Sequence, residues 1–124
     1  MITYDRDLSK RIYAATDIFL MPSKSEPCGL SQMIASRYGA IPVVRETGGL
    51  YDSIKPYWEE KKTIHGNGFT FANYSAEELK ERTVAALTLW LDAEKRKKLV
   101  TKIMKTDFSW AASAEKYMEM YRTL

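Results

Sequence analysis

The sequence is poor in the residues that build disulfides and metal centres, with one cysteine, Cys28, and one histidine, His65, among 124 residues. A single thiol cannot form an internal disulfide, which makes a reducing cytoplasm the default compartment. His65 has no cysteine or carboxylate at ligand spacing around it, so we expect an exposed loop residue without a functional role. These counts exclude a disulfide-stapled fold and argue against a Cys/His metal centre.

Long hydrophobic runs and a strong excess of one charge are also missing. No apolar stretch approaches the ~20 residues that a membrane-spanning helix needs. Met1 is followed at once by polar, charged sequence, which predicts no signal peptide. The net charge is only +3, and the densest basic run, Lys95–Lys98, adjoins Glu94, as is typical of a solvated helix face. We therefore expect neither a membrane nor a nucleic acid among the partners.

The residues that are present suit a single globular domain of the α/β class, with 45% hydrophobic and 28% charged residues. Three apolar runs predict strands, at residues 17–21, Ile41–Arg45 and, more weakly, 68–71. Pro42 has no N–H and must lie at the start of its strand or on an unpaired side. The polar residues 55–67 are expected to be irregular.

Helical patterns fill most of the rest. They are expected from Asp5 or Asp7 to Ala15, from Gly29 or Leu30 to Tyr38 with Gly39 as a stop, over 50–54, and in three helices that begin at Ser75, at Asp92 and near Asp107 or Ser109. Ser75 and Glu78 have the spacing of a capping box. Strands joined through helices predict a parallel sheet with right-handed crossovers. Three strands are fewer than the usual five or six, so a complete nucleotide-binding domain would contain further βα units.

The most informative segment is the polar loop that follows the first strand and contains Glu26. The carboxyl ends of parallel strands are where doubly wound α/β sheets bind ligands. The next helix begins near Gly29, with Leu30, Met33 and Ile34 on one face, and the first amides of a helix suit phosphate or hydroxyl oxygens. A carboxylate beside such amides predicts a ligand that carries both phosphate and hydroxyl groups.

Two motifs carry a family resemblance. The segment Glu26–Gln32 reads Glu-Pro-Cys-Gly-Leu-Ser-Gln, and Val44–Asp52 reads Val-Arg-Glu-Thr-Gly-Gly-Leu-Tyr-Asp. Together they resemble the bacterial glycogen synthase and starch synthase family, which are retaining glucosyltransferases with two Rossmann-like domains. The likeness extends from about Tyr4 to the C-terminus but covers only the last third or less of such an enzyme.

The resemblance implies a fold and a reaction. Residues 1–124 would form the C-terminal part of the nucleotide-sugar-binding domain, a partial Rossmann-like three-layer sandwich with a short parallel sheet and a helical C-terminus. The substrate would be ADP-glucose, the acceptor an α-1,4-glucan, and neither metal nor cofactor would be required. In the family, an Arg and a Lys from earlier in the C-terminal domain would bind the diphosphate, and a key His would come from the N-terminal domain. None of these residues precedes Tyr4 in this sequence.

The resemblance also implies roles for single residues. Glu26 would hold hydroxyls of the donor glucose and orient the sugar as its bond to the diphosphate breaks. Ile34 occupies the position eight residues later where the wider superfamily often has a second Glu, which the synthases commonly lack. Cys28, Gly29 and Leu30 would bind the ligand through backbone amides, and Ser31 would either donate a hydrogen bond to phosphate or be a routine helix-start hydroxyl. Thr47 and Gly48 would either frame the sugar or phosphate or form a plain turn. Tyr4 would either stack on adenine or pack in the core.

Two functional hypotheses of different classes stay open at this point. One is the C-terminal part of a glucan synthase, inactive alone; the other is a stand-alone, non-catalytic module that binds a nucleotide sugar or a protein. A reading frame that continues upstream into further βα units would favour the first. The last helix has Trp110, Tyr117, Met118 and Tyr121 at packing spacing, and without a covering partner this stripe and the sheet edge predict self-association.

Overall fold

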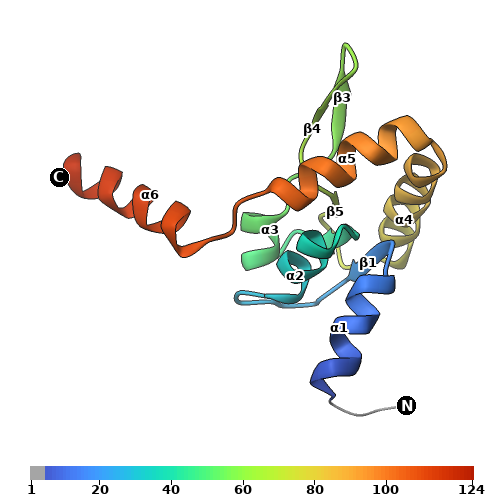
Figure 1. Cartoon of the computed structure of the whole chain (residues 1–124), viewed down its shortest axis with the longest axis horizontal. Coiled ribbons are helices and arrows are strands. Elements are labelled where there is room, and N and C mark those ends of the chain that lie inside the picture. Colours follow the sequence, from blue (N-terminus) through green and yellow to red (C-terminus); the bar gives the residue numbers. More distant parts are fainter. Residues whose placement is uncertain (1–4) are drawn as a thin grey trace.

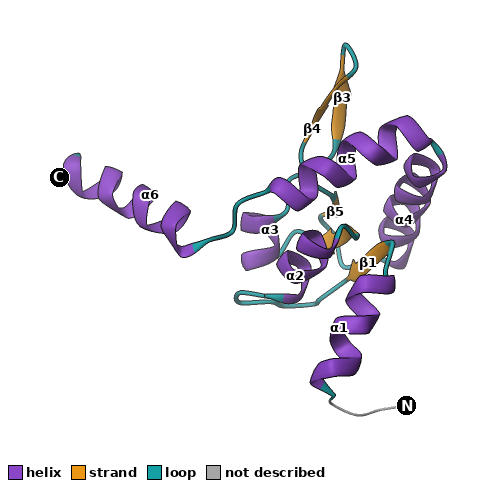
Figure 2. Cartoon of the chain, viewed as in Figure 1, coloured by secondary structure: helices purple, strands orange, loops and turns teal. Residues whose placement is uncertain are grey.

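A computed structural model of the chain describes residues 5–124 and shows a short sheet wrapped by helices (Figures 1 and 2). Tyr4, the expected adenine-stacking residue, lies outside the described residues. In chain order the elements are α1 (Arg6–Ala15), β1 (Ile18–Met21), α2 (Ser31–Tyr38), β2 (Ile41–Arg45), α3 (Gly49–Ser53), β3 (Trp58–Glu60), β4 (Thr63–His65), β5 (Phe69–Phe71), α4 (Ala76–Leu91), α5 (Ala93–Lys105) and α6 (Trp110–Arg122).

The main sheet has three parallel strands in the order β1-β2-β5, which confirms the predicted α/β fold. Ile18 pairs with Ile41 on one side of β2, and Val43 pairs with Phe69 on the other. Pro42 pairs with Phe19 of β1 but precedes the first residue of β2 that pairs with β5, so β2 is unpaired on that side at Pro42, which is one of the two expected placements.

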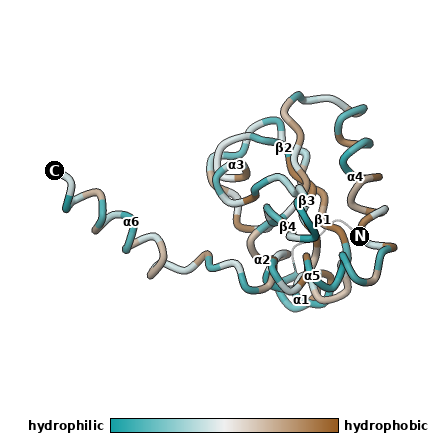
Figure 3. Tube along the Cα trace, turned by 90° about the horizontal axis from the view of Figure 1, so that it is seen from above, coloured by the Kyte–Doolittle hydropathy of each residue, from teal (hydrophilic) through white to brown (hydrophobic). Residues whose placement is uncertain are grey.

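The core lies on both faces of this sheet. Consecutive residues of a strand point to opposite faces. Accordingly, Val43 belongs to a cluster with Leu99 and Ile103 of α5, whereas Val44 belongs to a second cluster with Leu50 of α3. Figure 3 shows the hydrophobic segments gathered along the central strands. The result is the expected three-layer arrangement, with the sheet in the middle.

Helix α2 does not bury the apolar face that its sequence suggests. Leu30 and Ile34 are exposed, whereas Gln32, Ala35 and Ser36 are fully buried. Two of these buried side chains are polar, and each donates a hydrogen bond to a backbone carbonyl, which offsets part of the penalty of burying them. Their small or flat side chains let the helix approach its neighbours closely.

Residues 55–67 are not irregular, contrary to expectation, because they contain the antiparallel hairpin β3–β4. Its two-residue turn consists of Lys61 and Lys62, both with positive φ, at 47° and 70°. Turns of this kind favour Asn-Gly or Gly, so two lysines give no sequence signal for a hairpin. His65 is likewise not an exposed loop residue, since it lies in β4, is half-buried and stacks on Trp58.

The helix starts follow from side-chain caps. Ser75, Asp92 and Ser109 each accept a hydrogen bond from an amide in the first turn of the following helix, as predicted. The capping box is only half formed, because Glu78 bonds to Ala72 and Asn73 rather than reaching back to Ser75. That choice ties the end of β5 to α4.

Helix α6 extends away from the rest of the molecule (Figure 1). None of its residues is buried, and Trp110 is 89% exposed. The stripe of Trp110, Tyr117, Met118 and Tyr121 is uncovered within this chain, as expected without a covering partner, whereas Trp90 of α4 packs against the core. An apolar stripe is left open to solvent on this helix.

Candidate functional site

Two loops meet at the carboxyl edge of the sheet. One contains Glu26 and joins β1 to α2; the other contains Gly48 and joins β2 to α3. The Gly49 amide donates a hydrogen bond to the Glu26 carbonyl at 3.2 Å. A Cβ on Gly49 would lie 1.9 Å from the Cys28 carbonyl oxygen. The two sequence motifs are thus in direct backbone contact.

This contact explains the paired glycines. A Cβ on Gly48 would lie 1.9 Å from the Glu26 carbonyl oxygen, and Gly48 also has a positive φ of 47°. Any side chain at either position would push the loops apart. The glycines are needed for the loops to touch, whether or not Thr47 and Gly48 also frame a ligand, which stays a prediction.

The buried side-chain amide of Gln32 links the same two loops. Gln32 Nε2 donates to the Gly29 carbonyl at 2.7 Å and to Ser53 Oγ at 3.0 Å. Ser53 Oγ in turn donates to the Gly49 carbonyl at 2.6 Å. Gln32 Oε1 is buried and has no hydrogen-bond partner among residues 5–124. Because C=O and N–H point oppositely in a trans peptide, anchoring the Gly29 carbonyl inward turns the Leu30 amide outward.

Arg45, at the end of β2, fixes the start of the Glu26 loop. Its Nη1 donates to the Lys24 carbonyl at 2.7 Å, and its Nε donates to the Ala72 carbonyl at 3.2 Å. One guanidinium therefore links the segments that follow β1 and β5. Arg45, Gln32 and Ser53 were not singled out by the sequence reasoning. Gln32 and Arg45 lie inside the two motifs and Ser53 directly follows the second, so a polar side chain at these positions was the only available signal.

Among residues 5–124, the residues expected to bind a ligand are all exposed or half-buried. Glu26 is half-buried, and none of the residues 5–124 forms a hydrogen bond to its carboxylate. Cys28 is an exposed thiol, so packing does not account for it. Gly29 has φ +72°, a conformation that favours glycine. Leu30 is 63% exposed and starts α2 without a side-chain cap. The edge therefore presents a carboxylate acceptor next to outward amide donors.

The structure brings most of the predicted site residues together. Glu26, Cys28, Gly29, Leu30 and Ser31 share one loop and helix start, and Thr47 and Gly48 lie in the loop that contacts it. Their roles toward a ligand stay predictions. Tyr4 falls outside the described residues.

Beside this edge, a groove of about 640 Å³ runs between α2 and the segment that joins α5 to α6. It is lined by the apolar face of α2 that the core leaves unused, together with residues of the joining segment. The lining residues are Leu30, Met33, Ile34, Arg37 and residues 105–109.

Over residues 5–124, no group of three or more His, Cys, Asp or Glu side chains is placed to hold a metal ion. In the same residues, no helix combines the length and apolar character needed to cross a membrane.

Comparison with known proteins gives the class. The sequence profile described as "Glycosyl transferases group 1" matches residues 3–106. The chain therefore belongs to this glycosyl transferase family.

Two curated relatives narrow the similarity to glycogen synthases. The chain is 52% identical to a glycogen synthase of Clostridioides difficile over 99% of its own length and 25% of the relative's. It is 49% identical to a glycogen synthase of Bacillus subtilis over 97% of its own length and 24% of the relative's. The chain thus spans about a quarter of the curated relatives that it matches.

The fold has a solved counterpart. The catalytic domain of starch synthase IV from Arabidopsis thaliana, bound to ADP and acarbose, superposes with a TM-score of 0.85 at 44% identity. The match covers 99% of this chain and 25% of that one. It agrees with the predicted Rossmann-like architecture and confirms the resemblance to glycogen and starch synthases.

Proposed function

We propose that this chain forms the donor-side wall of a retaining glucosyltransferase, which transfers glucose from ADP-glucose to the non-reducing end of an α-1,4-glucan. The observation that carries the proposal is the locked pair of loops, which holds Glu26 beside outward helix amides at the carboxyl edge of the sheet. The naming of the relatives as glycogen synthases, and of the structural neighbour as an ADP-bound starch synthase, supports the choice of donor.

In this proposal Glu26 accepts hydrogen bonds from hydroxyls of the donor glucose. Its negative charge also lies near the positive charge that develops on the sugar ring as the bond to the diphosphate breaks. Such an interaction strengthens toward the transition state and accelerates the reaction. The amides of Cys28, Gly29 and Leu30 and the Ser31 hydroxyl bind sugar hydroxyls and the distal phosphate. Thr47 and Gly48 frame the same ligand.

The other half of the site belongs, in this proposal, to the three quarters of the relatives' length that the chain does not span. That part would bind the acceptor and complete the diphosphate site. The rate of a two-substrate transfer depends strongly on holding both reactants in orientation. We therefore infer that residues 1–124 alone are inactive, and we place the complete reaction in the cytoplasm.

A chimera tests the proposal. Residues 1–124 replace the matching quarter of the Clostridioides difficile glycogen synthase, and transfer of labelled glucose from ADP-glucose to glycogen is measured. The chimera is expected to transfer glucose, and the 124-residue chain alone is not. A correctly folded chimera without activity, or label incorporated in proportion to the isolated chain, would contradict the proposal.

A further inference from the structure

The β3–β4 hairpin has two chemically different faces. Its register pairs Trp58 with His65, Glu59 with Ile64 and Glu60 with Thr63. Because side chains alternate along a strand, Glu59 and Ile64 share one face. Ile64 packs against the core, and Glu59 Oε2 accepts a hydrogen bond from Lys95 Nζ of α5 at 2.7 Å. That bond holds the pKa of Glu59 below its ordinary value. This face is turned toward the body.

The opposite face, which we call the outer hairpin face, consists of Trp58, Glu60, Thr63 and His65. The indole of Trp58 and the imidazole of His65 stack with ring centroids 3.8 Å apart and planes at 10°. Trp58 is nevertheless 50% exposed. The imidazole covers one side of the indole and holds it in place, so the other side is available without a rotamer search.

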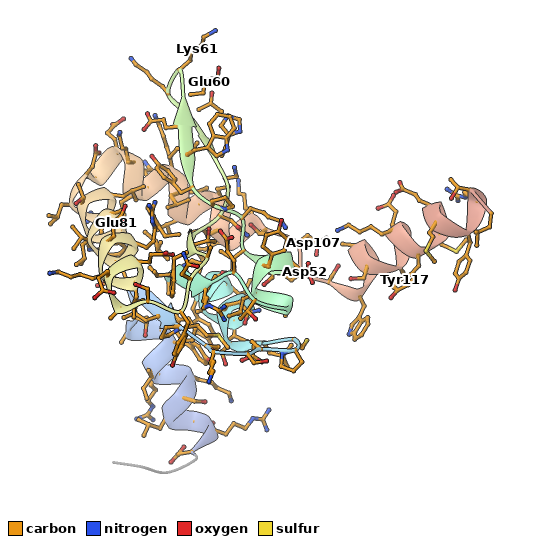
Figure 4. The ribbon with its side chains drawn as sticks, turned by 180° about the vertical axis from the view of Figure 1, so that it is seen from behind. Asp52, Glu60, Lys61, Glu81, Asp107 and Tyr117 are labelled. Carbon is orange, nitrogen blue, oxygen red and sulfur yellow. The ribbon has the colours of Figure 1, made fainter. Side chains whose placement is uncertain are left out.

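The turn of the hairpin supports this arrangement at a cost. Lys61 and Lys62 both adopt a left-handed conformation that side chains disfavour. A strained surface turn of this kind is a reason to look for a function nearby. Here the tight turn keeps Trp58 and His65 opposite each other in the two strands. Figure 4 shows Glu60 and Lys61 at the outer end of the hairpin, away from the body.

We propose that the outer hairpin face binds a chain of the α-1,4-glucan, outside the site that contains Glu26. A pyranose ring has an apolar C–H face that packs on an aromatic ring, and a rim of hydroxyls that needs hydrogen-bond partners. Trp58 supplies the first, and the Glu60 carboxylate and Thr63 hydroxyl supply the second. The carboxylate beside the indole disfavours a phosphorylated ligand on this face. The inference rests on the proposed function, whose acceptor is a glucose polymer.

The position of the hairpin makes the second contact useful. The hairpin joins α3 to the amino end of β5, where Pro56 forms a bridge with Gly68. The Glu26 loop lies at the carboxyl edge of the same sheet. Glucan held at the hairpin therefore does not compete for the donor site. A polymer anchored at one point has a raised effective concentration at the other.

The experiment uses the full 124-residue chain and maltoheptaose, with binding followed by amide chemical shifts and by affinity electrophoresis in glycogen-containing gels. We expect shift changes confined to the hairpin. Trp58→Ala should weaken binding by about tenfold or more, and Trp58→Phe should retain part of it. Glu60→Gln should also weaken binding, and its exposed position leaves the fold intact. The matched control is Trp110→Ala, which removes the exposed indole of α6 and should bind as the parent does.

Equal binding by the parent and Trp58→Ala would overturn the inference, as would loss of binding in Trp110→Ala. So would binding of heparin that depends on Lys61 and Lys62 without any binding of maltoheptaose, because the face would then recognise a polyanion. A chimera that transfers glucose while the chain fails to bind maltoheptaose refutes only this inference. Binding of maltoheptaose with an inactive chimera refutes only the proposed function.

Discussion

Replacing Gly49 with alanine should separate the two loops that form the candidate site. Unlike Gly48, Gly49 does not have a positive φ, so backbone strain is not part of the effect. The added Cβ would lie 1.9 Å from the Cys28 carbonyl oxygen and 2.6 Å from its carbonyl carbon. Both are backbone atoms, which cannot rotate out of the way as a flexible side chain can.

The size of the effect follows from that distance. Ordinary contact begins near 3.4 Å, so the loops must move apart by about 1.5 Å. Overpacking of this kind costs about 1–3 kcal/mol, and loss of the hydrogen bond from Gly49 to Glu26 adds about 0.5–1.5 kcal/mol. We expect a total of about 2–4 kcal/mol. For a domain of this length the melting temperature should fall by about 8–16 °C.

Two measurements on the 124-residue chain follow the change. Circular dichroism gives the melting temperature, and the rate of thiol labelling reports the position of the Glu26 loop, because Cys28 is the only cysteine and is exposed. The displaced loop of Gly49→Ala should label faster. Gly39→Ala is the matched control: its φ of 91° strains the chain, but its nearest neighbours are at 3.4 Å. It should lose stability without changing the labelling rate.

A Gly49→Ala variant that melts within about 2 °C of the parent, with Cys28 labelled at an unchanged rate, would contradict this expectation. The loops would then not be in backbone contact, and Gly49 would be a plain turn residue. A loss of stability with unchanged labelling would place the strain elsewhere than in the Glu26 loop.

Three further predictions concern the hydrogen bonds of Gln32, the loss of stability at acidic pH and the exposed helix α6. Gln32→Met should lower the free energy of unfolding in urea by about 1–3 kcal/mol, because the part-buried Gly29 carbonyl loses its donor; a variant as stable as the parent would mean that this bond is not needed. Hydrogen bonds from Asn73 hold the pKa of Glu78 below its ordinary value near 4.5, so its stabilising contribution is present above that pH and lost as the pH falls. The difference in melting temperature between Glu78→Gln and the parent should therefore shrink from pH 7 to pH 3, and a constant difference would refute the assignment. The chain should self-associate in sedimentation equilibrium through α6, where Trp110 is 89% and Tyr121 62% exposed. The double variant Trp110→Ser and Tyr121→Ser should dissociate. A parent that stays monomeric at high concentration without binding a hydrophobic dye would contradict this prediction.

The parts of the fold that follow local rules could be predicted from the sequence. Strands β1, β2 and β5 coincide with apolar runs, because parallel strands with both faces covered have few polar positions. Ser75, Asp92 and Gly39 mark helix ends because their side chain, or the lack of one, suits the cap. The loop with Glu26 could be placed at the ligand edge because topology alone puts it there.

The parts of the fold that depend on tertiary contacts could not be predicted from the sequence. The hairpin is held by Ile64 against the core and by Lys95 on Glu59, and its Lys61-Lys62 turn lacks the usual residues. Helix α2 buries Gln32 because the Gly29 carbonyl and the Ser53 hydroxyl accept hydrogen bonds from its amide. The periodicity of the sequence does not reveal such partners. The Gly48-Gly49 pair could be read as a turn, but not as a point of close loop contact.

The most direct test of the central claim is the turnover of the chimera with Glu26 replaced. Glu81, an exposed carboxylate of α4 (Figure 4), provides the control variant Glu81→Ala. We predict that Glu26→Ala lowers kcat by about 100-fold or more with a smaller change in the KM for ADP-glucose. Glu26→Gln should fall between, because it keeps the shape and loses the charge, and Glu81→Ala should match the parent. Near-normal kcat in Glu26→Ala would contradict the claim that this loop provides the reacting wall of the site.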